Sequence, residues 1–425
     1  MKQYEAYKDS GIQWLGEIPS HWETIAMKFY FYMKGRIGWQ GLKAEEFQET
    51  GPYLVTGTDF EKGRVVWDRC YHITEERYNE APEIHVKKGD LLITKDGTVG
   101  KLAYIDWLPE KVSLNSHLLI LRPLVSHISN KFIYWALQSP DFEYYTGLSQ
   151  NGSIMASLSQ EKIGEYKLGL PPLAEQEVIA AYLDLKVGQI DAILSEKEAM
   201  VEQLQQYRKS LISETVTRGL NPTAPMKDSG IDWIGQIPAH WVMVKLKYIS
   251  NLQSGSNLTS EQIEETGEYP VFGGNGLRGY YHDFNTEGDR VLIGRQGALC
   301  GNINYASGKF WATEHAVVCH PIKQYNVMWL GSLLEIMNLN QYSIASAQPG
   351  LSVDRIKQLE IPLPPFDEQQ EIGSFIEKKD LDIRRSISEL QSQIEDLKAY
   401  KSSVITEAVT GKVDLRNWKP SEVTA

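Results

Sequence analysis

An internal duplication constrains the fold of this chain more than any other feature of its sequence. The segment Lys8–Trp22, KDSGIQWLGEIPSHW, returns as Lys227–Trp241, KDSGIDWIGQIPAHW. The differences between the copies are conservative, and a match of this length does not arise by chance. The copies lie much further apart than the period of a solenoid repeat, so the sequence predicts a duplicated pair of domains rather than a repeat array.

Further matching segments define the duplicated unit. Leu170–Gln176 (LPPLAEQ) matches Leu363–Gln369 (LPPFDEQ), and Leu211–Thr217 matches Val404–Thr410. Each copy therefore has a Trp-rich lead, a variable region and a long helix. The variable regions share little sequence although their flanks match. This pattern predicts pseudo-two-fold architecture in which one scaffold presents two different surfaces.

Each Leu-Pro-Pro sequence precedes a long helical pattern. Proline fixes its own φ angle and disfavours the α region for the preceding residue, so each helix is expected to begin after it. Apolar side chains then recur at the four-three spacing of a coiled coil. In the second copy these are Ile376, Ile383, Ile387, Leu390, Ile394, Leu397 and Val404, and in the first copy Ile190, Leu194, Val201, Leu204 and Leu211, with Lys197 as an interruption.

Both ends of each helix carry local signals. Asp367 with Gln370 predicts an N-cap and a reciprocal capping pair in the second copy, whereas Ala174 stands at that place in the first. Gly219 and Gly411 predict the two stops. A helix of roughly 40 residues spans about 60 Å. Either each helix covers its own globular region, or the two pair. We expect an antiparallel pair, because the two apolar seams match in register; it would be a rigid spacer with a globular region at each end.

Composition limits the class of protein. The 425 residues indicate more than one domain. The net charge of −12 counts against a simple DNA-binding domain, although a few local side chains can make specific contacts and partners can supply phosphate contacts. The three cysteines are widely spaced, which fits a reducing cytoplasm and argues against a zinc site or disulfide framework. We see no membrane-length apolar run and no signal-peptide pattern, so we expect a cytoplasmic protein.

Both variable regions have the pattern of strands and turns with short helices. In the first, the strand-like Asp90–Lys95 leads into a glycine turn, and in the second Asp289–Arg295 does the same. This aligns Lys95 with Arg295. A Gly-Gly-Asn-Gly loop at 273–276 is open enough for the backbone to approach a ligand closely. Further polar turns stand at Asn151–Ser153 and Gln348–Gly350.

Short polar side chains beside Lys or Arg on glycine loops suit hydrogen bonding to base edges and phosphates. The alternative for any one loop is an ordinary turn, but matching placement in both regions favours the functional interpretation for the set. The candidates for DNA contact are Lys95, Thr98, Lys101, Asn115, Ser116 and His117 in the first region, and Asn275, Arg278, Arg295, Gln296, Thr313 and His315 in the second.

Enzyme motifs are incomplete in this sequence. Gly97–Leu102 lacks the glycine spacing and the Ser or Thr of a phosphate loop. Leu363–Phe366 has leucine where amino-methyltransferases place Asn or Asp before Pro-Pro-aromatic. The histidines show no metal-ligand spacing, and Glu165–Lys167 is at most half of a nuclease motif. We therefore expect a chain with no catalytic site and no metal.

The order of lead, variable region and Leu-Pro-Pro-hydrophobic-x-Glu-Gln helix, all repeated, resembles the specificity subunits of type I restriction-modification systems over essentially the whole chain. Gly273–Gly276, Ile293–Ala298 and Phe310–His315 are similar to segments of their target-recognition domains. The resemblance implies that each variable region reads one half of an interrupted site in double-stranded DNA. It also implies that the helices set the spacing and dock two methyltransferase subunits, which restriction-translocase subunits join. S-adenosylmethionine, ATP and magnesium would belong to those partners.

The expected fold is α+β: two mixed, strand-rich target-recognition domains joined by two long antiparallel coiled-coil helices, with pseudo-two-fold symmetry. The expected segments are a first domain at 1–169 with its lead at 1–22, a first helix at 170–219, a linker at 220–226, a second domain at 227–362 with its lead at 227–241, a second helix at 363–412, and a tail at 413–425.

For partner docking the candidates are the helix starts, with Glu175, Gln176, Glu368 and Gln369. The alternative for these four is simple electrostatics, because acidic side chains favour the N-terminus of a helix. Two rival functions stay open: a coiled-coil adaptor that binds proteins and reads no DNA, and a self-contained enzyme with two catalytic lobes.

Overall fold

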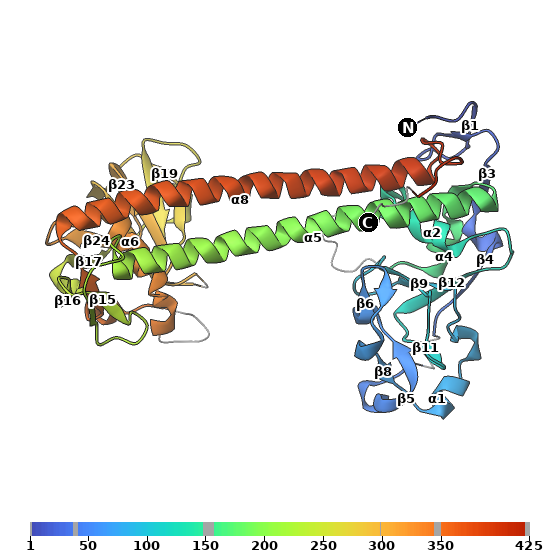
Figure 1. The fold of residues 1–425 in the computed structure, drawn as a ribbon, viewed down its shortest axis with the longest axis horizontal. Coiled ribbons are helices and arrows are strands. Elements are labelled where there is room, and N and C mark those ends of the chain that lie inside the picture. Colours follow the sequence, from blue (N-terminus) through green and yellow to red (C-terminus); the bar gives the residue numbers. More distant parts are fainter. Residues whose placement is uncertain (1, 37–40, 148–156, 298, 344–349, 421–425) are drawn as a thin grey trace. The chain divides into compact units, whose positions relative to one another are not determined.

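The computed structural model describes residues 2–36, 41–147, 157–297, 299–343 and 350–420 (Figure 1). The chain divides into two compact units. The first unit consists of Met1–Glu196 and Gln393–Ala425, and the second of Lys197–Ser392. The boundary crosses both long helices, so each unit contains one strand-rich domain and one end of each helix.

The first unit contains a four-stranded antiparallel sheet in the order β10-β9-β12-β4 and a three-stranded sheet in the order β11-β5-β8, in which β11 and β5 are parallel. Short antiparallel pairs join β1 to β2, β3 to β13 and β6 to β7. The strands are β1 (Tyr7–Asp9), β2 (Glu17–Pro19), β3 (Glu23–Ala26), β4 (Phe31–Lys34), β5 (Gln48–Val55), β6 (Phe60–Glu61), β7 (Arg64–Val65), β8 (Tyr71–His72), β9 (Leu91–Thr94), β10 (Leu102–Tyr104), β11 (Val112–Leu114), β12 (Leu118–Pro123) and β13 (Lys167–Leu170). The short helices are α1 (Glu75–Asn79), α2 (Asn130–Ala136), α3 (Pro140–Thr146) and α4 (Gln160–Glu165).

The second unit contains two four-stranded sheets, in the orders β17-β24-β21-β22 and β19-β18-β23-β20. Short antiparallel pairs join β14 to β15 and β16 to β25. The strands are β14 (Met226–Asp228), β15 (Gln236–Pro238), β16 (Val242–Lys245), β17 (Ser250–Ser254), β18 (Tyr269–Gly273), β19 (Gly276–Tyr281), β20 (Thr286–Glu287), β21 (Arg290–Gly294), β22 (Ile303–Ala306), β23 (Lys309–Ala312), β24 (Ala316–Pro321) and β25 (Glu360–Leu363). The short helices are α6 (Val327–Ile336) and α7 (Val353–Lys357).

The two domains share the topology of their main sheet and one parallel strand pair, although they share little sequence. In chain order, β4, β9, β10 and β12 correspond to β17, β21, β22 and β24, and both sets form a sheet with the same neighbours. The parallel pair of β11 with β5 corresponds to the parallel pair of β23 with β18. The central strands β9 and β21 are almost wholly buried, which explains their continuous apolar sequences. The predicted hairpins and the predicted duplication of the fold are therefore confirmed.

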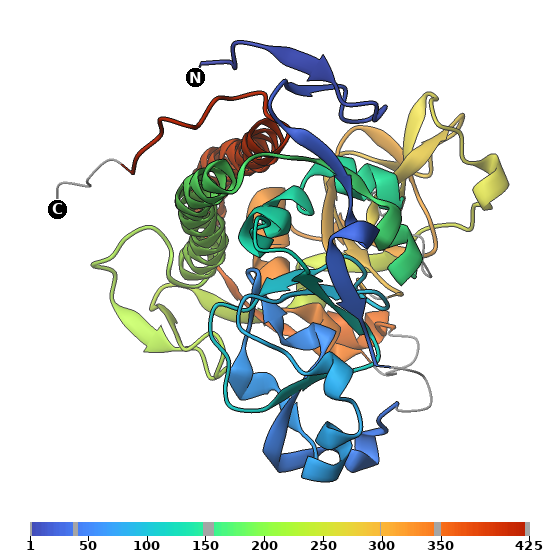
Figure 2. The same ribbon diagram turned by 90° about the vertical axis from the view of Figure 1, so that its right-hand side faces the viewer.

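The long helices are α5 (Leu173–Arg218) and α8 (Phe366–Val409), of 46 and 44 residues. In the first unit, Ile179 and Leu183 of α5 share a core with Val404 and Ala408 of α8. In the second unit, the other ends share a core, with Ile212 and Val216 of α5 and Ile372 and Ile376 of α8. The start of each helix thus meets the end of the other, as Figures 1 and 2 show. The predicted antiparallel pairing is confirmed, and each predicted seam position is buried or half-buried.

Ion pairs accompany the apolar seam inside each unit. In the first, Lys401 Nζ lies 2.7 Å from Asp191 Oδ1. In the second, Arg208 pairs with Asp380 of α8 and with Glu335 of α6. These pairs join the helices to each other and, through Glu335, to the neighbouring domain.

The predicted capping of α8 by Asp367 and Gln370 is wrong. The helix already begins at Phe366, so Asp367 lies within the first turn rather than at the N-cap. A glutamine secures both helix starts instead. Gln369 Nε2 donates to the carbonyl of Pro364 at 3.0 Å, and Gln176 Nε2 donates to the carbonyl of Pro171 at 2.7 Å. The two helix starts are therefore equivalent in this bond, although Ala174 stands in the first at the place of Asp367.

The predicted helix stops are confirmed, and both are tightly packed, since a Cβ atom at Gly411 would lie 2.3 Å from Pro19 Cδ. Gly219 follows α5 with a φ of +74°, a left-handed conformation that favours glycine. A Cβ atom there would lie 2.9 Å from Glu368 Oε1 and 3.2 Å from Trp241 Cζ2. Gly230 has a similar φ of +76°, but a Cβ atom there would meet nothing within 4 Å.

This difference predicts the relative cost of two alanine substitutions. Gly230→Ala should lower the free energy of unfolding of the second unit by roughly 1–2 kcal/mol, because only the left-handed backbone is strained. Gly219→Ala should cost at least about 1 kcal/mol more, because it also displaces Glu368 and Trp241. Calorimetric unfolding of the two variants and the parent chain measures the difference, and equal losses would contradict the packing described here.

Candidate nucleic-acid interface

Backbone hydrogen bonds fix the same framework at the turn of each predicted hairpin. The N–H group of Lys95 donates to the carbonyl of His117 at 2.9 Å, and the N–H group of Arg295 donates to that of His315 at 2.9 Å. The carbonyl of Lys95 accepts from Leu158 at 2.8 Å, and that of Arg295 accepts from Leu351 at 2.9 Å. The predicted alignment of Lys95 with Arg295 is thus confirmed by bonds on both sides of each residue.

In the second domain, four of the six predicted residues line one cavity of about 550 Å³. Asn275, Arg278, Gln296 and His315 lie around it, together with glycines of the 273–276 loop, Gly297 and Gly350. Gly276 has a φ of +98°, which lets β18 turn back into β19. The glycine loop therefore brings polar side chains from three separate turns to one hollow.

The polar groups around this hollow differ in how firmly they are held. Asn275 Oδ1 accepts from Asn302 Nδ2 at 3.1 Å, and Arg278 Nη2 donates to Ser260 Oγ at 3.3 Å. His315 Nε2 lies 3.2 Å from the carboxylate of Glu314. No hydrogen bond to the Gln296 side chain is found within the described ranges. The hollow therefore offers donors and acceptors of several kinds.

The two remaining candidates of the second domain lie differently. Arg295 is half-buried, and its Nη1 donates to Ser254 Oγ at 3.4 Å. Thr313 is completely buried, and its backbone N–H donates to the carbonyl of Phe272 at 2.9 Å. The prediction that Thr313 contacts DNA is therefore wrong, because its side chain does not reach the surface.

In the first domain, all six candidates lie at the β9–β10 turn or at the turn before β12. They are all exposed or half-exposed: Lys95, Thr98, Lys101, Asn115, Ser116 and His117. Asn115 Oδ1 accepts from both the N–H and the hydroxyl group of Ser116, and the N–H group of Leu118 closes the second turn by donating to the carbonyl of Asn115 at 3.2 Å. His117 Nδ1 lies 3.6 Å from Asp96 Oδ2, which links the second turn to the first.

A loop that the sequence prediction missed belongs to the same place in the first domain. The N–H group of Asn115 donates to the carbonyl of Val55, just as that of Thr313 donates to that of Phe272. Thr58 follows Val55 by three residues, as Asn275 follows Phe272, and both are exposed. The sequences before the two loops are similar, Gly51-Pro-Tyr-Leu-Val55 and Gly267-Glu-Tyr-Pro-Val271, but this similarity is offset by one residue from the pairing in the structure.

The predicted polar turns at Asn151–Ser153 and at residues 348 and 349 lie outside the described residues. Within those residues, no three His, Cys, Asp or Glu side chains gather in a way that could hold a metal ion. The search for a membrane-crossing helix over the same part of the chain finds none that is long and apolar enough.

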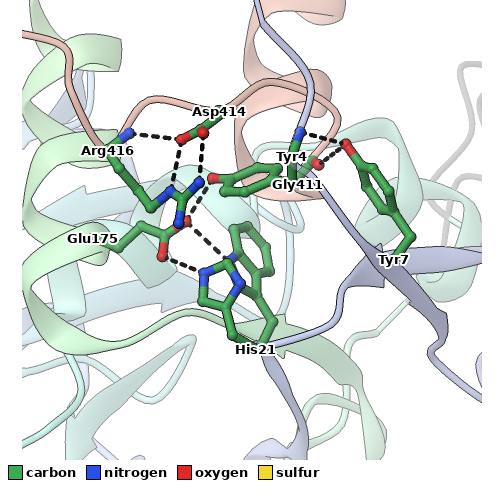
Figure 3. A network of polar contacts seen from close by, with 8 residues as sticks. Tyr4, Tyr7, His21, Glu175, Gly411, Asp414 and Arg416 are labelled. Atoms are coloured by element: carbon green, nitrogen blue, oxygen red, sulfur yellow. Dashed lines mark hydrogen bonds and ion pairs between the residues drawn. The ribbon is translucent and has the colours of Figure 1, made fainter.

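The four residues predicted at the helix starts form an internal joint in each unit. Glu175 accepts hydrogen bonds from the hydroxyl of Tyr4 and, at 3.0 Å, from Trp22 Nε1, and its other oxygen lies 2.8 Å from His21 Nε2 (Figure 3). In the second unit, Glu368 accepts from Trp241 Nε1 at 2.9 Å and lies 2.8 Å from His240 Nε2. Each glutamate thus binds the lead segment to the start of a long helix.

The neighbouring glutamines bind the same helix starts to the domains. Gln176 Oε1 accepts from the N–H group of Ser129, and Gln369 Oε1 accepts from that of Asn326, in each case just before a short helix. Glu175, Gln176 and Gln369 are buried. The structure assigns these side chains to the joint; the predicted docking of partners at the helix starts is not tested by it and stays a prediction.

The joint of the first unit also includes the segment that follows α8. Arg416 pairs with Asp414 at 2.7 Å and lies over the ring of Tyr4, 5.2 Å from its centroid (Figure 3). The hydrogen bonds from Arg416 hold the pKa of Asp414 below its usual range. Burial, assisted by the hydrogen bond to Glu175, raises the pKa of the Tyr4 hydroxyl, so it stays protonated as a donor.

Comparison with known protein families finds one model that matches both halves of the chain. The model describes a type I restriction modification DNA specificity domain and matches residues 38–203 and 238–396. These ranges include most of each variable region and most of each long helix.

Individual relatives give a consistent result. The type I restriction enzyme EcoprrI specificity subunit of Escherichia coli is 40% identical over 163 residues, which are 37% of this chain and 40% of that protein. The putative type I restriction enzyme MjaX specificity subunit of Methanocaldococcus jannaschii is 22% identical over 427 residues, 95% of this chain and 96% of that protein.

Solved structures share the fold. A chain from a study of complex assembly and conformational transition in the type I restriction-modification system has a TM-score of 0.68 at 14% identity, covering 93% of this chain and 99% of its own. The HsdS subunit from Thermoanaerobacter tengcongensis has a TM-score of 0.51 at 16% identity, covering 93% of this chain and 98% of its own.

The joint in the first unit predicts a large effect for one carboxylate. Glu175→Ala leaves the buried donors of Tyr4 and Trp22 without an acceptor, so the first unit should lose roughly 3 kcal/mol of unfolding free energy. Glu177→Ala, at an exposed position of the same helix turn, should change it by less than about 0.5 kcal/mol. Calorimetric unfolding of both variants measures these losses of unfolding free energy. If Glu175→Ala costs no more than Glu177→Ala, the buried network contributes little to stability.

Proposed function

Since the chain belongs to the family of type I restriction-modification DNA specificity proteins, as a specificity subunit with two target-recognition domains, we propose that each domain reads one half of a two-part DNA site. The observation that carries this proposal is the pair of domains with one main-sheet topology and different polar side chains at matching turns. The scaffold that the two domains share places both sets of side chains alike, and the differences between the side chains give each half-site its own sequence.

The side chains around the matching turns have the chemistry that base readout requires. Amides and guanidinium groups form paired hydrogen bonds to adenine and guanine edges in the major groove, and lysines contact phosphates. The second domain offers Asn275, Arg278 and Gln296 around its hollow, and the first offers Lys95 and Lys101 beside its glycine turn. The net charge of −12 implies that partners supply much of the phosphate contact.

The proposed partners are two methyltransferase subunits, which dock along the long helices, and restriction-translocase subunits that join them. Relatives with this name are specificity subunits, a non-catalytic component of such systems. We therefore assign S-adenosylmethionine, ATP and magnesium to the partners, and we place the complex in the cytoplasm with the DNA it modifies.

The long helices are proposed to set the distance between the two half-sites. Both are continuous across the boundary between the units, and inside each unit they are paired through apolar cores and ion pairs. If both helices of the pair are lengthened equally, the whole pair becomes longer, because the apolar seam keeps the two helices in register.

Exchange of one domain tests the two-part readout. A hybrid in which residues 23–169 come from a relative with another target should methylate a site with one new half and one unchanged half. Methylation-resolved sequencing of the host genome gives both halves at once. A change in both halves would contradict separate readout, and an assembled complex without any sequence-selective DNA binding would favour the protein adaptor instead.

Insertion of one heptad into each helix tests the spacer. Seven residues placed after Glu196 and seven after Ser392, where the units meet, preserve the seam and add about 10 Å of helix. The gap between the half-sites should grow by about three base pairs, at about 3.4 Å per base pair, while both half-sites stay the same. The same sequencing measures the gap, and an unchanged gap would show that the helices do not set it.

A further inference from the structure

The residue directly before the first glycine of the turn, between β9 and β10 in one domain and between β21 and β22 in the other, differs in chemical type between the two domains. Because Lys95 and Arg295 are matched by backbone bonds on both of their sides, the residues that follow them, Asp96 and Gln296, occupy corresponding positions. Each is followed by a glycine with positive φ, Gly97 at +76° and Gly297 at +92°. The scaffold is therefore the same at this position, and only the side chain changes.

The turns close in the same way as well. The N–H group of Gly100 donates to the carbonyl of Thr94 at 2.9 Å, and that of Gly301 donates to the carbonyl of Gly294 at 2.8 Å. The second turn is longer by one residue, but the additional residue comes after Gln296. Hence the length difference does not disturb the match of positions 96 and 296.

Gln296 has a fixed backbone and an available side chain. Its backbone forms a β-bridge with Gly350, and its side chain is exposed at the hollow that Asn275, Arg278 and His315 also line. Over the described residues, the structure records no hydrogen bond that engages its amide. An amide presents one donor and one acceptor side by side, the pattern that matches N7 and N6 of adenine.

Asp96 presents the opposite chemistry at the matching position. Its side chain is half-exposed, and one of its oxygens lies 3.6 Å from His117 Nδ1. A carboxylate has about four acceptor sites and no donor, so this contact leaves acceptors free. Among the bases in the major groove, cytosine N4 is the donor that suits a carboxylate.

We propose that positions 96 and 296 are corresponding specificity-determining positions, where Gln296 selects adenine in one half-site and Asp96 selects cytosine in the other. The inference rests on the proposed function, since it concerns how the two domains read DNA. It adds which side chain distinguishes the halves at one position and which base each accepts.

Isosteric substitutions test the assignment in the complete complex with methyltransferase subunits. Gln296→Glu removes the donor and should shift one position of one half-site from adenine towards cytosine. Asp96→Asn adds a donor and should shift one position of the other half-site from cytosine towards adenine. The change in preference should be roughly ten- to a hundredfold, as measured by methylation rates on duplexes with each of the four bases at that position.

Matched controls carry the same chemical changes elsewhere in the same domains. Gln324→Glu lies beyond the end of β24 opposite to His315, and Asp106→Asn lies beyond the end of β10 opposite to the glycine turn. Both positions are exposed, and both variants should methylate the parent site without a change of motif.

The outcomes separate this inference from the function on which it rests. A parent complex without a two-part motif would overturn the proposed function itself. A normal two-part motif that neither isosteric variant alters would overturn only the assignment of positions 96 and 296. If an isosteric variant loses all methylation, the variant Gln296→Ala provides the test. A relaxed choice of base at a single position of the half-site supports the assignment. An unchanged motif, or a loss of base preference spread evenly over the site, refutes it.

Discussion

The architecture depends on a carboxylate at the start of each long helix, that of Glu175, which is buried, and that of Glu368, which is half-buried. Glu175 and Glu368 each bind a tryptophan and a histidine of the lead segment, and the glutamine beside each binds the first residues of a short domain helix. A buried acceptor with several donors is costly to disturb, because each donor left alone loses its hydrogen bond away from water. The orientation of helix against domain is therefore fixed by directional bonds as well as by apolar contacts.

The same joint explains why the flanks of the two copies match while their interiors differ. His and Trp of the lead, Glu and Gln of the helix start, and the prolines before it all take part in it. The side-chain contacts between turn residues, such as those of His117 with Asp96 and of Asn275 with Asn302, lie at exposed or half-exposed positions instead. A turn closed by backbone bonds keeps its shape with many side chains, which lets the surface vary while the scaffold is retained.

Much of the fold could be predicted from the sequence because its signals are periodic or repeated. The seam positions from Ile376 to Val404 and the stops at Gly219 and Gly411 follow from spacing and backbone preference alone. The errors arose where a distant residue decides the local outcome. Asp367 is a good N-cap residue by type, but α8 already begins at Phe366, where the side chain of Gln369 holds the carbonyl of Pro364 just before the helix.

Prediction of the candidate site failed for the same reason, because residues distant in the sequence decide which side chains reach the surface. Thr313 stands beside the half-exposed Glu314 in the sequence, yet its backbone pairing with Phe272 turns its side chain into the core. Thr58 was missed because only the parallel pairing of β5 with β11 reveals that its loop belongs with the β9–β10 turn.

The order of assembly on the ribosome follows from the way the units divide the chain. The second unit is one continuous stretch, whereas the first needs Gln393–Ala425 to complete its core and its joint. During synthesis, the half that begins first is therefore the half that is finished last, after Arg416 has left the exit tunnel.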